Sequence, residues 1–161
     1  MLTKGNYIKT TLLAMSLSAI VSSFTSISFA TNEVQFSKAL QSEHRAEKDK
    51  ERDVDRKPQQ VMQFFGIEPG MTVLEVLSSG GYYTEVISHR VGEKGKVIAQ
   101  NNKFILEVMD GRFSKEFKER TANNRLANVT HYKKEFGEFD LNNEVDVVTV
   151  VLNYHDLYSA V

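Results

Sequence analysis

The fold of this 161-residue chain is most constrained by a regular alternation of buried strands with helices. Four apolar, β-branched runs predict strands at Thr72–Leu77, Lys96–Gln100, Asn128–Tyr132 and Glu144–Leu152. Helical patterns cover Pro58–Phe65, Tyr82–Val91 and Asn102–Asn123, the last with Gly111 as a candidate break. Strands that alternate with helices indicate an α/β fold with a parallel sheet, here of about four strands.

The first thirty residues have the three-part pattern of a secretory signal. Lys4 and Lys9 precede the apolar run Thr11–Val21, and Ser28-Phe29-Ala30 places small residues as a cleavage site requires. We therefore expect an exported, periplasmic protein of the bacterial type, with residues 1–30 removed. An uncleaved anchor is the alternative, but its serines and threonines make a poor membrane span. We expect no stable membrane insertion after cleavage.

Residues 31–57 form a charged lead-in to the core domain that we expect at residues 58–161. Six acids and six bases balance one another between Glu43 and Lys57. One interpretation is a solvated helix or loose arm. The other is a flap over a site, to which Arg45, Arg52 or Arg56 would contribute.

Composition excludes several classes of function. The formal net charge of -1 gives no electrostatic reason to expect a nucleic-acid partner. The absence of cysteine excludes thiolate nucleophiles, disulfides and cysteine-bound zinc. His44, His89 and His131 are isolated in the sequence, so we expect no metal site.

The segment from Val73 to Val91 contains the best candidate for a ligand site. Ser78-Ser79-Gly80-Gly81 joins a buried strand to a helix, and ligands of parallel α/β folds bind at this end of the strands. Small residues there let a ligand approach the backbone and the free N–H groups of the helix. Neither the P-loop nor the G-x-G-x-x-G fingerprint fits this loop. A plain turn is the alternative interpretation.

The order of motifs around this loop resembles that of class I S-adenosylmethionine-dependent methyltransferases. The motifs are Ile67–Glu75, Gly80–Glu85 and Val91–Val97. With Arg56-Lys57-Pro58, Phe64–Ile67 and Asn153–Asp156, the chain resembles more narrowly a family of exported bacterial "predicted methyltransferases", over roughly residues 45–158. The resemblance implies S-adenosylmethionine as cofactor and a Rossmann-like methyltransferase core, of which this chain has the N-terminal part.

The resemblance also implies which residues bind the cofactor. The family's hydrophobic-hydrophobic-acid-x-G-x-G-x-G motif falls on Val73–Gly81, with Glu75 at the acidic position and Leu77, Ser79 and Gly81 at the glycine positions. A leucine at a glycine position is expected to crowd the cofactor or to change the loop. In the family an acidic residue after the second strand binds the ribose hydroxyls, and Asn101 is the residue nearest that position here. A neutral amide binds a hydroxyl less strongly than a carboxylate does. The implied cofactor-binding residues are Glu75, Ser79, Gly80, Gly81 and Asn101.

Asn153, His155 and Asp156 follow the fourth strand, where the family's methyl-transfer site lies. His155 is the candidate base, Asp156 would orient it, and Asn153 would hold the substrate. Alternatively, Asn153 or Asp156 caps the next helix. We expect methyl transfer to a small acceptor of unknown identity.

Two other functions stay open. Leu77, Ser79 and Asn101 favour a non-catalytic binding module with the same fold. A remnant of a longer gene is the third interpretation, because the family pattern expects further strands after Asp156.

Overall fold

A computed structural model describes residues 31–142 and 144–158 of the chain. The chain divides into two units, Met1–Lys38 and Ala39–Val161, and residues 31–38 of the first unit are helical. The predicted signal segment, residues 1–30, lies outside the described residues. Within the described ranges, no helix combines the length and the apolar character needed to cross a bilayer.

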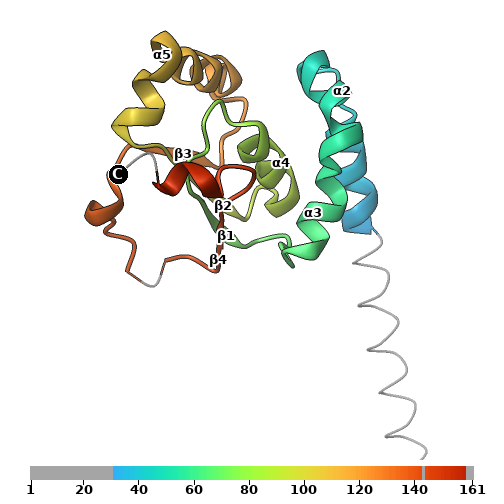
Figure 1. Cartoon of the computed structure of the whole chain (residues 1–161). Coiled ribbons are helices and arrows are strands. Elements are labelled where there is room, and N and C mark those ends of the chain that lie inside the picture. Colours follow the sequence, from blue (N-terminus) through green and yellow to red (C-terminus); the bar gives the residue numbers. More distant parts are fainter. Residues whose placement is uncertain (1–30, 143, 159–161) are drawn as a thin grey trace, which may run out of the picture. The chain divides into compact units, whose positions relative to one another are not determined.

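Four parallel strands form the sheet of the second unit, which confirms the predicted α/β fold (Figure 1). The strands are β1 (Thr72–Glu75), β2 (Lys96–Gln100), β3 (Val129–Tyr132) and β4 (Val147–Thr149). Their order in space is β3-β2-β1-β4. The chain moves outward from β1 to β3 and then returns to the other side of β1. This reversal beside β1 is the place where open parallel sheets form a ligand crevice.

Helices and short 3-10 turns connect and cover the strands. The helices are α2 (Glu47–Arg56), α3 (Pro58–Phe64), α4 (Tyr82–Val91) and α5 (Lys103–Arg120). The 3-10 turns are η1 (Ala122–Asn124), η2 (Phe136–Glu138) and η3 (Tyr154–Tyr158). Helix α4 packs against β1 and β2, and α3 packs against α4 (Figure 1). Helices α3 and α4 are therefore stacked outward from the sheet.

The core lies on both faces of the two central strands. Val73 and Val97 are fully buried, and so is nearly all of Leu74 and Ile98. One cluster joins Leu74, Val76 and Leu77 to Ile98 and Ile105. Burial of each such side chain contributes roughly 1.5–3 kcal/mol, which is why continuous apolar runs identified these strands in the sequence.

Two elements differ from the sequence-based prediction. Strand β4 is three residues long instead of covering Glu144–Leu152, because it pairs only with β1, whose ladder ends at Glu75↔Thr149. Leu152 then adopts a left-handed backbone with φ 63° and turns away from the sheet. Helix α5 contains the predicted break, but the non-helical backbone already begins at Val108 and continues to Gly111.

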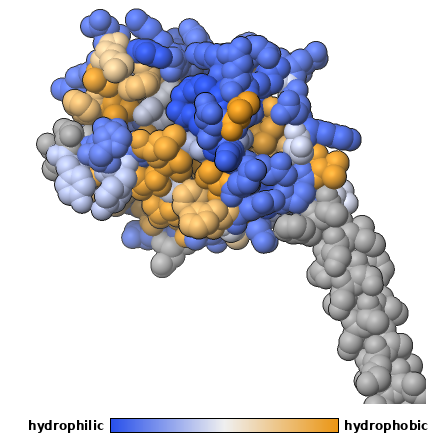
Figure 2. All heavy atoms as spheres, turned by 45° about the vertical axis from the view of Figure 1, so that its right-hand side comes forward, coloured by the Kyte–Doolittle hydropathy of each residue, from blue (hydrophilic) through white to orange (hydrophobic). Residues whose placement is uncertain are grey.

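The outer side of β4 has no strand partner among the described residues. Three large apolar side chains nearby are exposed: Phe64, Val148 and Leu152. A groove of about 730 Å³ runs between α3 and the segment after β4. Figure 2 shows apolar side chains gathered on this face beside a hydrophilic surface. An unpaired edge with apolar neighbours can accept another strand, and β4 is such an edge.

Candidate functional site

The loop after β1 has a left-handed backbone at every second position. The φ angle is 53° at Leu77, 53° at Ser79 and 83° at Gly81. These are the three positions that the sequence resemblance assigned to glycine. The leucine side chain is 0% exposed and lies in the core cluster. Leu77 therefore adopts the glycine-type backbone and turns its side chain into the protein.

The end of β2 holds this strained loop through hydrogen bonds to three consecutive backbone N–H groups. Leu77 N donates to Gln100 Oε1 (3.0 Å), Ser78 N to the Gln100 carbonyl (2.8 Å) and Ser79 N to Asn101 Oδ1 (2.8 Å). Asn101 Nδ2 donates back to the Ser79 carbonyl at 3.2 Å. A left-handed L-residue costs about 1–2 kcal/mol, and these bonds offset that cost.

Glycine substitutions separate the strain of the loop from the packing of its side chains. We expect Ser79→Gly to change the free energy of unfolding by less than about 1 kcal/mol, because relief of strain opposes the added chain entropy. Leu77→Gly should lower it by about 3–5 kcal/mol, because a fully buried side chain is lost. Urea denaturation of both variants measures the difference, and equal effects would contradict this interpretation of the loop.

A cavity of about 290 Å³ opens beside this loop. Its wall is formed by the loop, by α2 and α5, by the start of α4 and by the segment after β4. The lining residues are Lys48, Arg52, Arg56, Glu75, Leu77, Ser78, Ser79, Gly80, Gly81, Tyr82, Tyr83, Phe113, Glu116, Arg120, Val151, Leu152, Asn153 and Asp156. The cavity thus lies at the carboxyl end of β1, where the sequence predicted a ligand site.

The structure brings most of the predicted site residues together. Those that line the cavity are Glu75, Ser79, Gly80, Gly81, Asn153 and Asp156. Asn101 differs from expectation, since it is 1% exposed and its side chain is bound to Ser79 and lies 3.3 Å from His131 Nε2. His155 also differs, because its side chain is 79% exposed and only its neighbour Asp156, 3.3 Å away, lines the cavity.

Glu75 is a buried carboxyl group at the floor of the site. It accepts a hydrogen bond from the Thr84 hydroxyl. Burial raises the pKa of Glu75 to about 8, although the Thr84 hydrogen bond and the charge of Arg120 act in the opposite direction. At neutral pH the group is therefore mainly a neutral acid that can donate as well as accept a hydrogen bond.

Two buried oxygen atoms at the cavity wall have no hydrogen-bond partner in residues 31–142 and 144–158. They are Ser78 Oγ and Asn153 Oδ1. Asn153 Nδ2 donates to the carbonyls of Leu77 and Val76, so its orientation is fixed by the loop. Since buried polar atoms are normally satisfied, these two acceptors point to a ligand that carries hydrogen-bond donors.

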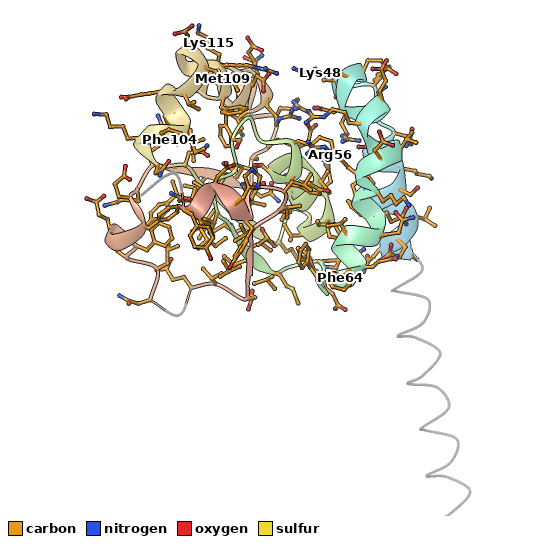
Figure 3. The ribbon with its side chains drawn as sticks, in the orientation of Figure 1. Lys48, Arg56, Phe64, Phe104, Met109 and Lys115 are labelled. Atoms are coloured by element: carbon orange, nitrogen blue, oxygen red, sulfur yellow. The ribbon has the colours of Figure 1, made fainter. Side chains whose placement is uncertain are left out.

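Sequence reasoning assigned no site role to Lys48, Glu116 or Arg120, all of which line the cavity. Lys48, Arg52 and Arg56 recur every four residues on α2, which is the signal for one helix face. Figure 3 shows Lys48 and Arg56 on the side of α2 that faces α4 and α5. Arg45 is not among the residues that line the cavity, and its Nη1 atom lies 2.6 Å from Asp53 Oδ2. Helix α2 therefore forms one wall of the site through Lys48, Arg52 and Arg56.

Comparison with known proteins agrees with this geometry. Residues 57–127 match the family model of protein-L-isoaspartate(D-aspartate) O-methyltransferases. A SAM-dependent methyltransferase from Aquifex aeolicus has a similar structure, with 33% sequence identity and a TM-score of 0.53. That similarity covers 62% of this chain and 50% of the other. The chain has a methyltransferase fold.

A second solved structure is a protein-L-isoaspartate O-methyltransferase. It shares 26% sequence identity with this chain, at a TM-score of 0.45. The match covers 58% of this chain and 27% of that protein. No curated protein matches the sequence. This methyltransferase-fold chain thus spans half the length of the Aquifex aeolicus relative, and the assignment of the fold rests on that relative.

Proposed function

We propose that the chain binds S-adenosylmethionine in the cavity beside the Ser78–Gly81 loop and transfers its methyl group to a small acceptor. The observation that carries this proposal is the loop itself, because its three left-handed positions coincide with the glycine positions of the methyltransferase motif. One similar solved structure is a SAM-dependent methyltransferase, which supports the same cofactor.

The residues at the cavity fit the amino-acid end of this cofactor. Ser78 Oγ and Asn153 Oδ1 are buried acceptors without a partner among the described residues, as an ammonium group requires. Arg52 and Arg56 supply positive charge for a carboxylate. When bound, the cofactor would supply a methyl group on a sulfonium, and the protein would orient the acceptor and, where the acceptor carries one, remove its proton.

Asp156 is the proposed proton acceptor, in place of the sequence-based assignment to His155. Its carboxylate lines the cavity, whereas the imidazole of His155 lies outside and contacts it at 3.3 Å. His155 would then position and modulate Asp156. The family that matches residues 57–127 is named for isoaspartate, so a carboxyl acceptor is one candidate substrate.

Calorimetric titration of the full chain with S-adenosylmethionine and S-adenosylhomocysteine tests the proposal. We expect saturable binding of both, and Asp156→Asn should leave both affinities within threefold of wild type while lowering transfer from labelled cofactor. Absence of binding at millimolar ligand, with the fold confirmed by circular dichroism, would falsify the proposed function.

Ser78→Ala should affect stability and binding in opposite directions. Removal of a buried hydroxyl without a partner should leave the free energy of unfolding unchanged or raise it by up to about 1 kcal/mol. The same change should weaken S-adenosylhomocysteine binding about tenfold, since a hydrogen-bond acceptor for the ligand is lost. Thermal denaturation and calorimetry on the same samples measure the two effects. Unchanged binding would remove Ser78 from the proposed site.

Asn101 favours a second candidate function, a binding module without catalysis. In the proposed cofactor pose its side chain would have to bind the ribose, but it is held by both backbone groups of Ser79. Tight binding of S-adenosylhomocysteine without methyl transfer to any carboxyl acceptor would support this second function.

A further inference from the structure

We propose that the cavity contains a subsite for a carboxylate, formed by the guanidinium groups of Arg52 and Arg56 with Lys48 beside them. The inference rests on the proposed function and names the ligand group that α2 receives. Two sources can supply this group: the amino-acid end of the cofactor, or an anionic acceptor. The three residues lie on α2, which precedes the segment 57–127 that matches the methyltransferase family.

The acids of α2 do not neutralise its cavity side, although acids and bases alternate in the sequence. Asp49 is fully buried and binds Arg120 Nη2 at 2.7 Å, with Arg52 Nη1 more distant at 3.4 Å. Asp53 accepts hydrogen bonds from Arg45 Nη1 (2.6 Å) and from the Tyr82 hydroxyl (2.6 Å). Both carboxylates thus have their shortest contacts with Arg45, Arg120 and Tyr82, while Lys48, Arg52 and Arg56 on the same side of the helix line the cavity.

Arg56 forms no ion pair with any residue in the described ranges 31–142 and 144–158. Its guanidinium carbon lies 4.6 Å from the centre of the Tyr82 ring and 5.8 Å from that of Tyr83. Arg52 lies over the same Tyr82 ring at 5.2 Å. Contact with an aromatic ring orients a guanidinium and leaves its N–H groups free, which is the arrangement that receives a carboxylate with two hydrogen bonds.

The remaining charges at the cavity have partners of their own. Glu116 lies 3.1 Å from Arg112 Nε and 3.7 Å from Lys48 Nζ. Asp156 contacts His155, and Arg120 binds Asp49 and Glu85. Glu75 is bound to Thr84. The bases left without a strong partner are therefore Arg52 and Arg56, and the cavity also holds the carboxylate of Asp156, whose partner His155 is a cation only when protonated.

Calorimetric titration of the full chain with three probes tests the subsite. S-adenosylhomocysteine carries the amino-acid end, 5′-methylthioadenosine lacks it, and malonate is a free dicarboxylate. The variants are Arg56→Gln, Arg52→Gln and Arg56→Lys, which retains the charge but loses the planar fork. Lys115→Gln is the matched control, because it removes one exposed charge from α5 outside the cavity. Circular dichroism confirms that each variant is folded.

If the cofactor supplies the carboxylate, Arg56→Gln lowers the affinity for S-adenosylhomocysteine at least tenfold and leaves the affinity for 5′-methylthioadenosine unchanged. If the acceptor supplies the carboxylate, Arg56→Gln lowers the affinity for malonate at least tenfold and leaves the affinities for both nucleosides unchanged. Either result supports the subsite. Equal affinities of wild type and both Gln variants for all three probes overturn it. A fourth result is that wild type binds neither nucleoside but binds malonate, and that Arg56→Gln weakens malonate binding. This result refutes cofactor binding and supports the anion subsite.

Discussion

We expect Arg120→Ala to lower the free energy of unfolding by about 3–5 kcal/mol, one of the largest effects of any single change in this chain. The guanidinium group of Arg120 binds two fully buried carboxylates, Asp49 at 2.7 Å and Glu85. Its Nε also donates to the Gly80 carbonyl at 3.0 Å. The alanine variant leaves two buried charges with fewer partners and releases the loop. Urea denaturation at pH 7 measures the loss.

Arg112→Ala is the matched control for this prediction. Arg112 lies on the same helix, pairs with Glu116 at 3.1 Å, and has a side chain that is 63% exposed. An exposed pair contributes at most about 1 kcal/mol. Similar losses for the two alanine variants would show that the buried network around Arg120 does not stabilise the fold.

The same network predicts how stability responds to acid. Burial alone would raise the pKa of Glu85, but the neighbouring His89, Arg125 and Arg120 side chains lower it to about 2. A folded pKa below the unfolded value near 4.5 contributes stability above pH 4.5, and this stability is lost as the pH falls toward 2. Arg120→Ala should therefore show a smaller loss of stability between pH 4.5 and 2 than wild type.

We expect Glu75→Gln to be more stable than wild type at alkaline pH, with an advantage that grows by about 1.5 kcal/mol between pH 6.5 and 8. Burial raises the pKa of Glu75 to about 8, so the folded state keeps a proton that the unfolded chain releases near pH 4.5. Stability then falls as the pH rises through this window. Glutamine cannot ionise and can still bond to the Thr84 hydroxyl. Denaturation at several pH values measures the difference.

The window above pH 6.5 avoids an opposing contribution from His131. Burial and the charge of Lys133 lower the pKa of His131 to about 4, so that group stabilises the folded state as the pH rises toward 6.5. Glu68→Gln, at an exposed glutamate in the loop before β1, is the control and should differ from wild type by a constant amount. A constant difference for Glu75→Gln as well would show that Glu75 ionises normally in the folded protein.

The sequence predicted the fold well because its evidence is local. Apolar runs such as Val73–Val76, interrupted only by Glu75, and Val97–Ala99 are typical of a strand that is covered on both faces, and β1 and β2 are the central strands. The end of β4 was predicted poorly, because Val150 and Val151 are as apolar as the strand residues before them. Only the length of the partner strand β1 ended that ladder, and a partner's length is not visible in a local pattern.

The candidate site was predicted in part, for a similar reason. Motif order placed Glu75, Ser79, Gly80 and Gly81 at one cavity, since they are neighbours in the chain. The role of Asn101 was not visible, because its side chain is directed by hydrogen bonds to a loop twenty-two residues away. Charge spacing on α2 contained the signal for Lys48, Arg52 and Arg56, but not which side of the helix faces the site.

The sequence by itself determined the parallel α/β fold and the loop after the first strand, through apolar periodicity and the small residues Ser78–Gly81. The tertiary structure alone decided that Leu77 and Ser79 keep a left-handed backbone, because the oxygens that accept hydrogen bonds from their N–H groups belong to Gln100 and Asn101, at the end of another strand. It also decided which charges of α2 are paired. Arg120, seventy-one positions after Asp49 in the chain, binds that carboxylate more closely than Arg52 does, although Arg52 is on the same helix. Such partners are set by three-dimensional proximity, which spacing along the chain does not encode.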